Sequence, residues 1–232
     1  SKNVRNNGNE GKIIIRDAWG ALRPGRVTFI IGPSGAGKTT LLNILAGRRK
    51  TGVSGSVLGA RSEVVLVPQH AALIETMTAQ ETLQFAAALK LPNLSQRERQ
   101  YAIEHVSKQL GIQDVLKTRA GRLSGGEVKR LTISCEMLTD PPVMLLDEPT
   151  SGLDSVSSVS VVRALRNIAS SGRTVACVIH QPSSKVYSCG DDVLVLADGR
   201  TLYAGSIINA PEALTQAGFN CPNYYNVADY RE

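Results

Sequence analysis

Short apolar segments alternate along the chain with segments whose apolar residues recur at helical spacing. Runs rich in β-branched residues predict strands, and segments with a period near 3.6 residues predict helices. The predicted strands are 12–16, 26–31, 63–67, 143–146, 173–179, 191–197 and 200–204. The predicted helices are 38–46, 79–89, 96–110, 126–138 and 155–169. Strands that alternate with helices predict an α/β fold with a mostly parallel sheet.

The middle of the chain departs from this alternation, because it contains three predicted helices and no strand. We therefore expect one domain over residues 1–232, with a core of about 1–69 and 140–232 and a helical subdomain of about 70–139. The longest apolar runs, such as 175–179, have the length of a strand. Crossing a bilayer takes roughly 18 to 20 apolar residues, so no membrane-spanning segment is predicted within these residues.

Composition and charge narrow the possible partners. The chain carries 26 Lys and Arg against 20 Asp and Glu, a formal net charge of +6. A basic protein can bind nucleic acid, but here basic and acidic residues are interleaved, as in 97–99, so no nucleic acid is expected as a partner. The four cysteines are far apart and include no CxxC pair, which is typical of a reducing compartment.

A phosphate-binding loop is predicted directly after the second strand. Residues 32–39 read Gly-Pro-Ser-Gly-Ala-Gly-Lys-Thr and match the pattern GxxxxGK[ST] between a strand and a helix. Glycines let backbone N–H groups surround phosphate, and the helix N-terminus adds partial positive charge. We expect Lys38 to reach the β- and γ-phosphates and Thr39 to ligate Mg²⁺. A plain Gly-rich turn is the alternative, and the strand–loop–helix context favours nucleotide binding. The predicted nucleotide-binding residues here are Gly32, Pro33, Ser34, Gly35, Ala36, Gly37, Lys38, Thr39 and Thr40.

A second site element is predicted where the apolar strand 143–146 ends in Asp147 and Glu148. Ligands of parallel sheets gather at the carboxyl ends of strands, so this pair is expected beside the phosphate loop. We expect Asp147 to anchor Mg²⁺ and its waters, and Glu148 to orient a water that attacks the γ-phosphate. Two acids before Pro149 are also typical of a simple turn, but the upstream phosphate loop favours catalysis.

The segment Leu123–Glu127, with the sequence Leu-Ser-Gly-Gly-Glu, points to a family. It resembles the signature sequence of ATP-binding-cassette (ABC) proteins. Ser124 with Glu127 is also a helix capping box, and the two interpretations are compatible, because a capped helix N-terminus with two glycines is itself an anion site. The resemblance implies that Ser124, Gly125, Gly126 and Glu127 face the γ-phosphate of ATP held by a partner subunit.

Other elements that resemble the ABC family follow in the same order. Gln69 resembles the glutamine that contacts Mg²⁺ and the attacking water, and 151–154 (Ser-Gly-Leu-Asp) matches the loop that crosses the dimer interface. His180 matches the histidine that contacts the γ-phosphate. A lone histidine at a strand end is usually structural, but its place in this motif order favours a functional role. Together these assignments make Glu148, His180 and Gln69 the catalytic residues, and Thr39, Gln69 and Asp147 the Mg²⁺-binding residues.

Flanking segments resemble subfamily G, the White-type half-transporters, over nearly the whole chain. They are 46–52, 139–142, 180–183 and 226–230. The resemblance implies a RecA-like P-loop ATPase core, a small antiparallel β subdomain and an α-helical subdomain that carries the signature. It implies ATP and Mg²⁺ as ligands, a second nucleotide-binding domain as homo- or heterodimer partner, and a transmembrane domain of the same polypeptide outside these residues. ATP hydrolysis at the cytoplasmic face of a membrane would then drive transport.

Three departures from the family pattern accompany this resemblance. Residues 1–11 contain no aromatic that could stack on adenine, 55–69 looks shorter than its family equivalent, and the connecting helix to the membrane is expected to lie beyond Glu232. Segment 71–78 is the candidate contact for the membrane domain, with an ordinary buried loop as the alternative.

Two rival functions are a soluble ABC ATPase of translation or DNA repair, and a non-hydrolysing regulatory cassette. The retained Glu148 and the signature glycines speak against the second.

Overall fold

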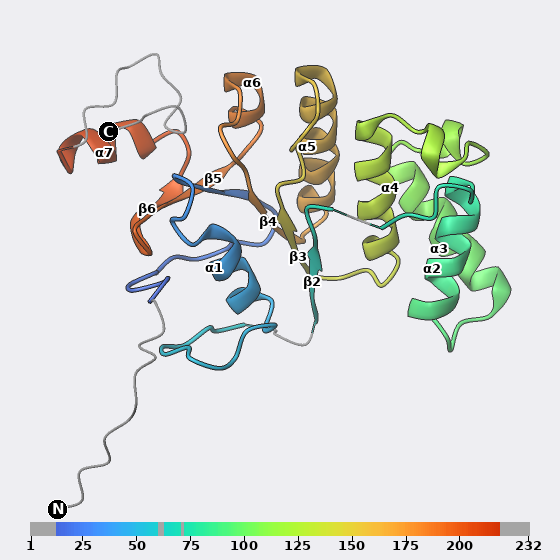
Figure 1. Cartoon of the computed structure of the whole chain (residues 1–232), viewed down its shortest axis with the longest axis horizontal. Helices are drawn as coiled ribbons and strands as arrows, with labels where there is room; N and C mark the ends of the chain where they lie inside the picture. Colours follow the sequence, from blue (N-terminus) through green and yellow to red (C-terminus); the bar gives the residue numbers. More distant parts are fainter. Residues whose placement is uncertain (1–12, 60–62, 71, 219–232) are drawn as a thin grey trace, which may run out of the picture.

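A six-stranded sheet forms the centre of the computed structural model, which describes residues 13–59, 63–70 and 72–218 (Figure 1). Its strands are β1 (Val27–Ile31), β2 (Val64–Val67), β3 (Val143–Asp147), β4 (Thr174–Val178), β5 (Asp192–Ala197) and β6 (Arg200–Ser206). They lie in the order β2-β3-β4-β1-β5-β6. All neighbours pair in parallel except β6, which runs antiparallel to β5 at one edge. The predicted α/β class with a mostly parallel sheet is confirmed.

The helices follow the predicted pattern, with short additions. They are α1 (Lys38–Leu45), α2 (Ala79–Lys90), α3 (Gln96–Gln109), α4 (Gly125–Met137), α5 (Ser155–Ser170), α6 (Ser184–Tyr187) and α7 (Ala210–Gln216), with 3₁₀ turns η2 (Gln113–Val115) and η3 (Ala120–Arg122). Thr78, Ser95 and Ser124 each begin a helix with a capping box, in which a glutamate three residues later closes the reciprocal hydrogen bonds. The periodicity did not predict α6 or α7, which have only four and seven residues.

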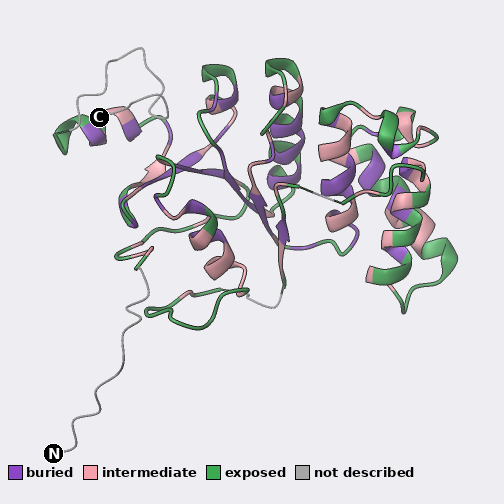
Figure 2. Ribbon diagram, in the orientation of Figure 1, coloured by how far each residue is buried: buried purple, intermediate pink, exposed green. Residues whose placement is uncertain are grey.

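Helices cover both faces of the sheet, and alternate residues of one strand belong to opposite faces. Phe29 packs with the cluster under α2 to α5, whereas Ile30 packs with the cluster under α1. Figure 2 shows burial concentrated in the strands and in the helix faces turned toward them. Every residue of β1 and β4 is buried. This two-sided burial explains why these strands are continuous apolar runs rather than alternating patterns.

The predicted strand 12–16 does not form where the segment is described, because 13–16 contains no strand residue. The Arg16 N–H donates to the Gly199 carbonyl at 2.8 Å, and Asp17 makes an isolated bridge with Arg200. The segment therefore runs beside the turn between β5 and β6, and its strand-like pairing is limited to the single bridge of Asp17. Within the described residues, the antiparallel ladder belongs to β5 and β6 of the main sheet, and 48–59 contains no strand that would build a separate β subdomain.

Some predicted features lie outside the described residues. They are the aromatic-free segment 1–11, Ala71 at the start of the candidate membrane contact, and the subfamily-like segment 226–230. In the part of the chain that is described, the helices are all too short or too polar to cross a membrane.

Candidate functional site

Four adjacent parallel strands end at one edge of the sheet, and each leads into a predicted site element. In sheet order, β2 leads to Gln69, β3 to Asp147 and Glu148, β4 to His180 and β1 to the phosphate loop 32–39. Parallel strands share the edge at which their carboxyl ends lie, and this edge is the usual ligand site of such sheets. The topology therefore gathers residues that are far apart in the sequence.

The phosphate loop forms a tight cradle around the buried Lys38. The Nζ atom of Lys38 donates to the carbonyl oxygens of Gly32 at 2.8 Å and Pro33 at 2.9 Å. A Cβ atom at Gly32 would lie 1.9 Å from the Leu196 carbonyl oxygen, so only glycine fits there. Gly37 precedes α1 with a left-handed φ of 97° and supplies no side-chain cap, which leaves the first amides of the helix to another acceptor. Such amides suit a phosphate.

The Lys38 ammonium is held near the two acidic side chains. Burial lowers its pKa, and the charges of Glu148 and Asp147 partly offset that effect. A desolvated cation gains more from an anion than a solvated one does, because the local dielectric screening is weaker. Lys38 is thus placed to interact strongly with a polyphosphate.

Thr39 and Asp147 form the candidate Mg²⁺ site. Thr39 Oγ1 donates to Asp147 Oδ1 at 3.3 Å, joining α1 to the end of β3. Burial is the largest cause that raises the pKa of Asp147, and the Thr39 hydrogen bond opposes it. Hydroxyl and carboxylate oxygens are ligands that Mg²⁺ prefers. Among the described residues, no cluster of three or more His, Cys, Asp or Glu could hold a metal ion, so Mg²⁺ would also need phosphate oxygens and water.

Glu148 and Gln69 meet directly. Gln69 Nε2 donates to Glu148 Oε2 at 2.8 Å and to Ser151 Oγ at 3.4 Å. The backbone of Glu148 has a φ of 47°, an uncommon value for a residue other than glycine, and its N–H donates to the Val178 carbonyl at 3.0 Å. This bond ties the turn after β3 to the end of β4. The carboxylate is therefore oriented by backbone geometry and by the glutamine amide.

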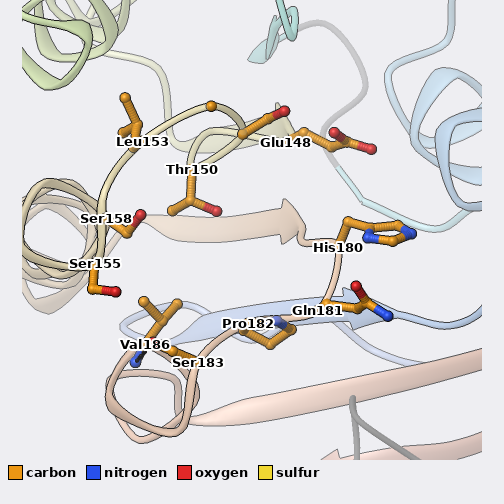
Figure 3. A pocket seen from close by; sticks show the side chains of 12 residues that line it. Glu148, Thr150, Leu153, Ser155, Ser158, His180, Gln181, Pro182, Ser183 and Val186 are labelled. Carbon is orange, nitrogen blue, oxygen red and sulfur yellow. Dashed lines mark hydrogen bonds between the residues drawn. The ribbon is translucent and has the colours of Figure 1, made fainter. Parts of the chain in front are cut away.

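His180 connects the phosphate loop to a neighbouring hollow. Its Nε2 lies 3.3 Å from Ser34 Oγ. Figure 3 shows the Glu148 carboxylate and the His180 imidazole on the same side of the strand ends. The hollow has a volume of about 360 Å³ and is lined by residues of the segments 148–158 and 180–186. The structure thus brings Gln69, Glu148 and His180 to one edge together with the phosphate loop.

The signature segment lies apart from this cluster. Ser124 and Gly125 are exposed. Hydrogen bonds from Ser124 to the Glu127 carboxylate lower the pKa of Glu127, and the bond from the Ser124 side chain contributes more than the bond from its backbone N–H. A Cβ atom at Gly125 would lie 2.9 Å from Leu153 Cδ2, which places the start of α4 against the 151–154 loop. Among the described residues, no hydrogen bond joins 124–127 to the phosphate loop.

Two contacts of Gln69 were not predicted from the sequence, one with Ser151 of the predicted interface loop and one with Lys129. Ser151 accepts a hydrogen bond from Gln69, and the Lys129 ammonium donates to the Gln69 backbone carbonyl. Lys129 follows Gly126 by three positions on α4, so it extends the packed face of that helix. A lysine at a core-facing helical position is the signal that would have identified it.

Comparison with known proteins is consistent with this geometry. Residues 15–151 match the family model described as ABC transporter. Over 94% of the chain, it is 41% identical to ABC transporter G family member 13 of Arabidopsis thaliana, 42% to the ABC transporter ATP-binding protein/permease wht-1 of Caenorhabditis elegans and 37% to Protein white of Drosophila melanogaster. The chain spans 34%, 36% and 35% of these relatives, about a third of their length. These relatives give no support to a role in translation or DNA repair.

Proposed function

Because this chain belongs to the ABC transporter family, we propose that it binds and hydrolyses ATP to drive transport across a membrane. The observation that carries the proposal is the row of four adjacent strand ends, which presents a phosphate loop, two carboxylates, a glutamine and a histidine at one edge. A metal-supported phosphoryl transfer to water needs these groups: a cradle for phosphate, oxygen ligands for Mg²⁺, and a carboxylate for the water.

Each group has a role that follows from its position. Lys38 and the amides that begin α1 would bind the β- and γ-phosphates, and Thr39 and Asp147 would hold Mg²⁺, which would offset the phosphate charge. Glu148 orients the attacking water and can accept its proton, while Gln69 holds the carboxylate in place. His180, next to Ser34 of the phosphate loop, contacts the γ-phosphate.

The position of the signature segment supports a dimer. Ser124 and Gly125 are exposed and lie against the 151–154 loop instead of the phosphate loop of the same chain. Val156, just beyond that loop, is an apolar side chain with 81% exposure. We expect this face to meet a second nucleotide-binding domain, so that the signature of each copy completes the ATP site of the other.

The relatives support a membrane domain in the same polypeptide, since the printed name of one joins an ATP-binding protein to a permease. In that arrangement the chain works at the cytoplasmic face of a membrane. The described residues 72–78 are exposed or half-buried, with Ile74 at 54% exposure, so they do not form the buried loop that was the alternative. The exposure of this segment leaves it accessible, and we propose it as the contact for the membrane domain.

The substitution Glu148→Gln tests the proposed chemistry. It preserves size and hydrogen bonding but removes the carboxylate, so we expect ATP turnover to fall by about 10²-fold or more. ATP affinity should change little, because the phosphate contacts come from other residues. Turnover is measured by phosphate release and affinity by calorimetry with Mg²⁺.

A matched control is Glu104→Gln, which removes a carboxylate from the exposed surface of α3 and should leave turnover unchanged. Wild-type chain without ATPase activity at any protein concentration, or a Glu148→Gln variant with full activity, would contradict the proposal. Full activity in the variant would mean that another group orients the water.

A further inference from the structure

A lysine on the packed face of α4 reaches the catalytic cluster. Lys129 lies three residues after Gly126 and four before Ile133, both of which are buried, so it belongs to the same face of the helix. Its ammonium donates a hydrogen bond to the backbone carbonyl of Gln69. Lysine usually keeps its charge in water, and a half-buried ammonium needs specific partners.

Two carboxylates of the site also act on the charge of Lys129. Burial lowers the pKa of Lys129, while the charges of Glu148 and Asp147 act in the opposite direction. Lys38 interacts with the same two carboxylates from the phosphate loop. Both lysines therefore feel the field of the same two carboxylates, and Lys129 is the one that belongs to the signature helix.

Gln69 is held on its backbone by Lys129 and on its side chain by Glu148 and Ser151. The ladder of β2 ends at Val67, so Gln69 lies beyond the sheet hydrogen bonds that would fix its backbone. Lys129 supplies a backbone contact there, and the Gln69 amide then reaches Glu148 Oε2 at 2.8 Å. Loss of the Lys129 contact would leave the Gln69 backbone without this support, and the bond between the Gln69 amide and Glu148 would weaken.

We propose that Lys129 is a positioning residue for ATP hydrolysis, which holds the Gln69 backbone so that the side-chain amide meets Glu148. The inference rests on the proposed function, because it assigns a role within the same site. In this proposal Lys129 acts through its bond to Gln69. Because α4 begins with the signature segment 124–127, this bond links the signature helix to Gln69.

The substitution Lys129→Met removes the ammonium while keeping a long side chain that suits a helix. We expect kcat to fall about tenfold and ATP affinity to stay within about twofold, because the phosphate loop is untouched. Lys129→Arg keeps a charged donor and should recover kcat to within about threefold of wild type. Lys108→Met is the matched control, since it removes an exposed lysine from the neighbouring α3 and should have no effect.

A double-mutant cycle separates positioning from a merely structural role. If Lys129 acts through Gln69, the variant with both Lys129→Met and Gln69→Ala should be within about twofold of Gln69→Ala alone. If the fold-losses of kcat in the two single variants multiplied in the double variant, the inference would be overturned. An unchanged kcat in Lys129→Met would also overturn it. Thermal unfolding of each variant checks the fold, and Lys129→Gln is a second uncharged variant for the cycle. An inactive wild-type chain would instead overturn the proposed function, and this inference with it.

Discussion

Two helix N-termini of this protein are both rich in glycine, yet they are built in opposite ways. At α1, Gly37 offers no side-chain cap, no acidic residue lies in the first turn, and the buried Lys38 is bonded within the loop. At α4, Ser124 caps the helix, and Glu127 closes a capping box on an exposed surface. The first terminus leaves amides and a cation for a phosphate, whereas at the second the Ser124 side chain already accepts a hydrogen bond from the Glu127 amide.

This difference shows why one chain supplies two unlike halves of an ATP site. The base of the phosphate loop packs against its own sheet, since a Cβ atom at Gly32 would collide with the Leu196 carbonyl, while residues 33–35 are exposed. Such a cradle can bind polyphosphate by itself. The α4 terminus is stable without a ligand and is exposed beside the 151–154 loop, so a phosphate brought by a second copy can reach it.

The largest effect should come from Lys38→Ala. Its ammonium faces the phosphates in a confined loop where water cannot replace it, so ATP affinity should fall by about 100-fold or more. Lys50→Ala, which removes an exposed lysine shortly after α1, should leave affinity unchanged. Calorimetry with Mg²⁺ measures both variants. If Lys38→Ala bound ATP with wild-type affinity, residues 32–40 would not form the ATP site. The contrast between the two helix termini would then not hold.

A mixing experiment tests whether the α4 terminus serves another copy. Ser124→Asp keeps a good helix cap but places a negative charge toward the phosphate, so it should inactivate the variant, as Lys38→Ala should. In a mixed dimer, the intact phosphate loop of one chain meets the intact signature of the other. Equal mixing should restore about one quarter of wild-type turnover, because half of the dimers carry one working site of two.

This recovered turnover should rise with protein concentration, since weak self-association limits assembly of the site. Each variant alone at the same total concentration is the control. A mixture no more active than its two components would show that the site is complete within one chain.

The smallest effect concerns the stability of α4. Ser124→Ala removes the side-chain cap and should lower the free energy of unfolding by about 1 kcal/mol. Ser124→Asp should stay within a few tenths of wild type, because aspartate also caps helices well. Denaturant unfolding measures the difference. Equal stability of the alanine variant would mean that the observed hydrogen bonds of Ser124 with Glu127 contribute nothing net.

Many features of the site are local in sequence and were therefore predicted from it. A phosphate loop needs glycines at fixed spacing, and a capping box needs Ser or Thr with Glu three residues later, so both are apparent in a short segment. The strand 12–16 failed as a prediction because a strand needs a neighbouring strand, and apolar spacing does not report one. The short helices α6 and α7 carry too little periodicity to identify.

The sequence by itself determined the α/β class, the helix starts and the residue types for phosphate chemistry, since these depend on hydrogen bonds and periodicities within a few residues. Only the tertiary structure decided that β2, β3, β4 and β1 lie side by side with their carboxyl ends at one edge. It also decided that Lys129 reaches Gln69 and that Ser124 and Gly125 of the signature are exposed beside the 151–154 loop. These contacts join residues distant in sequence, and non-local packing of the sheet and its helices sets them.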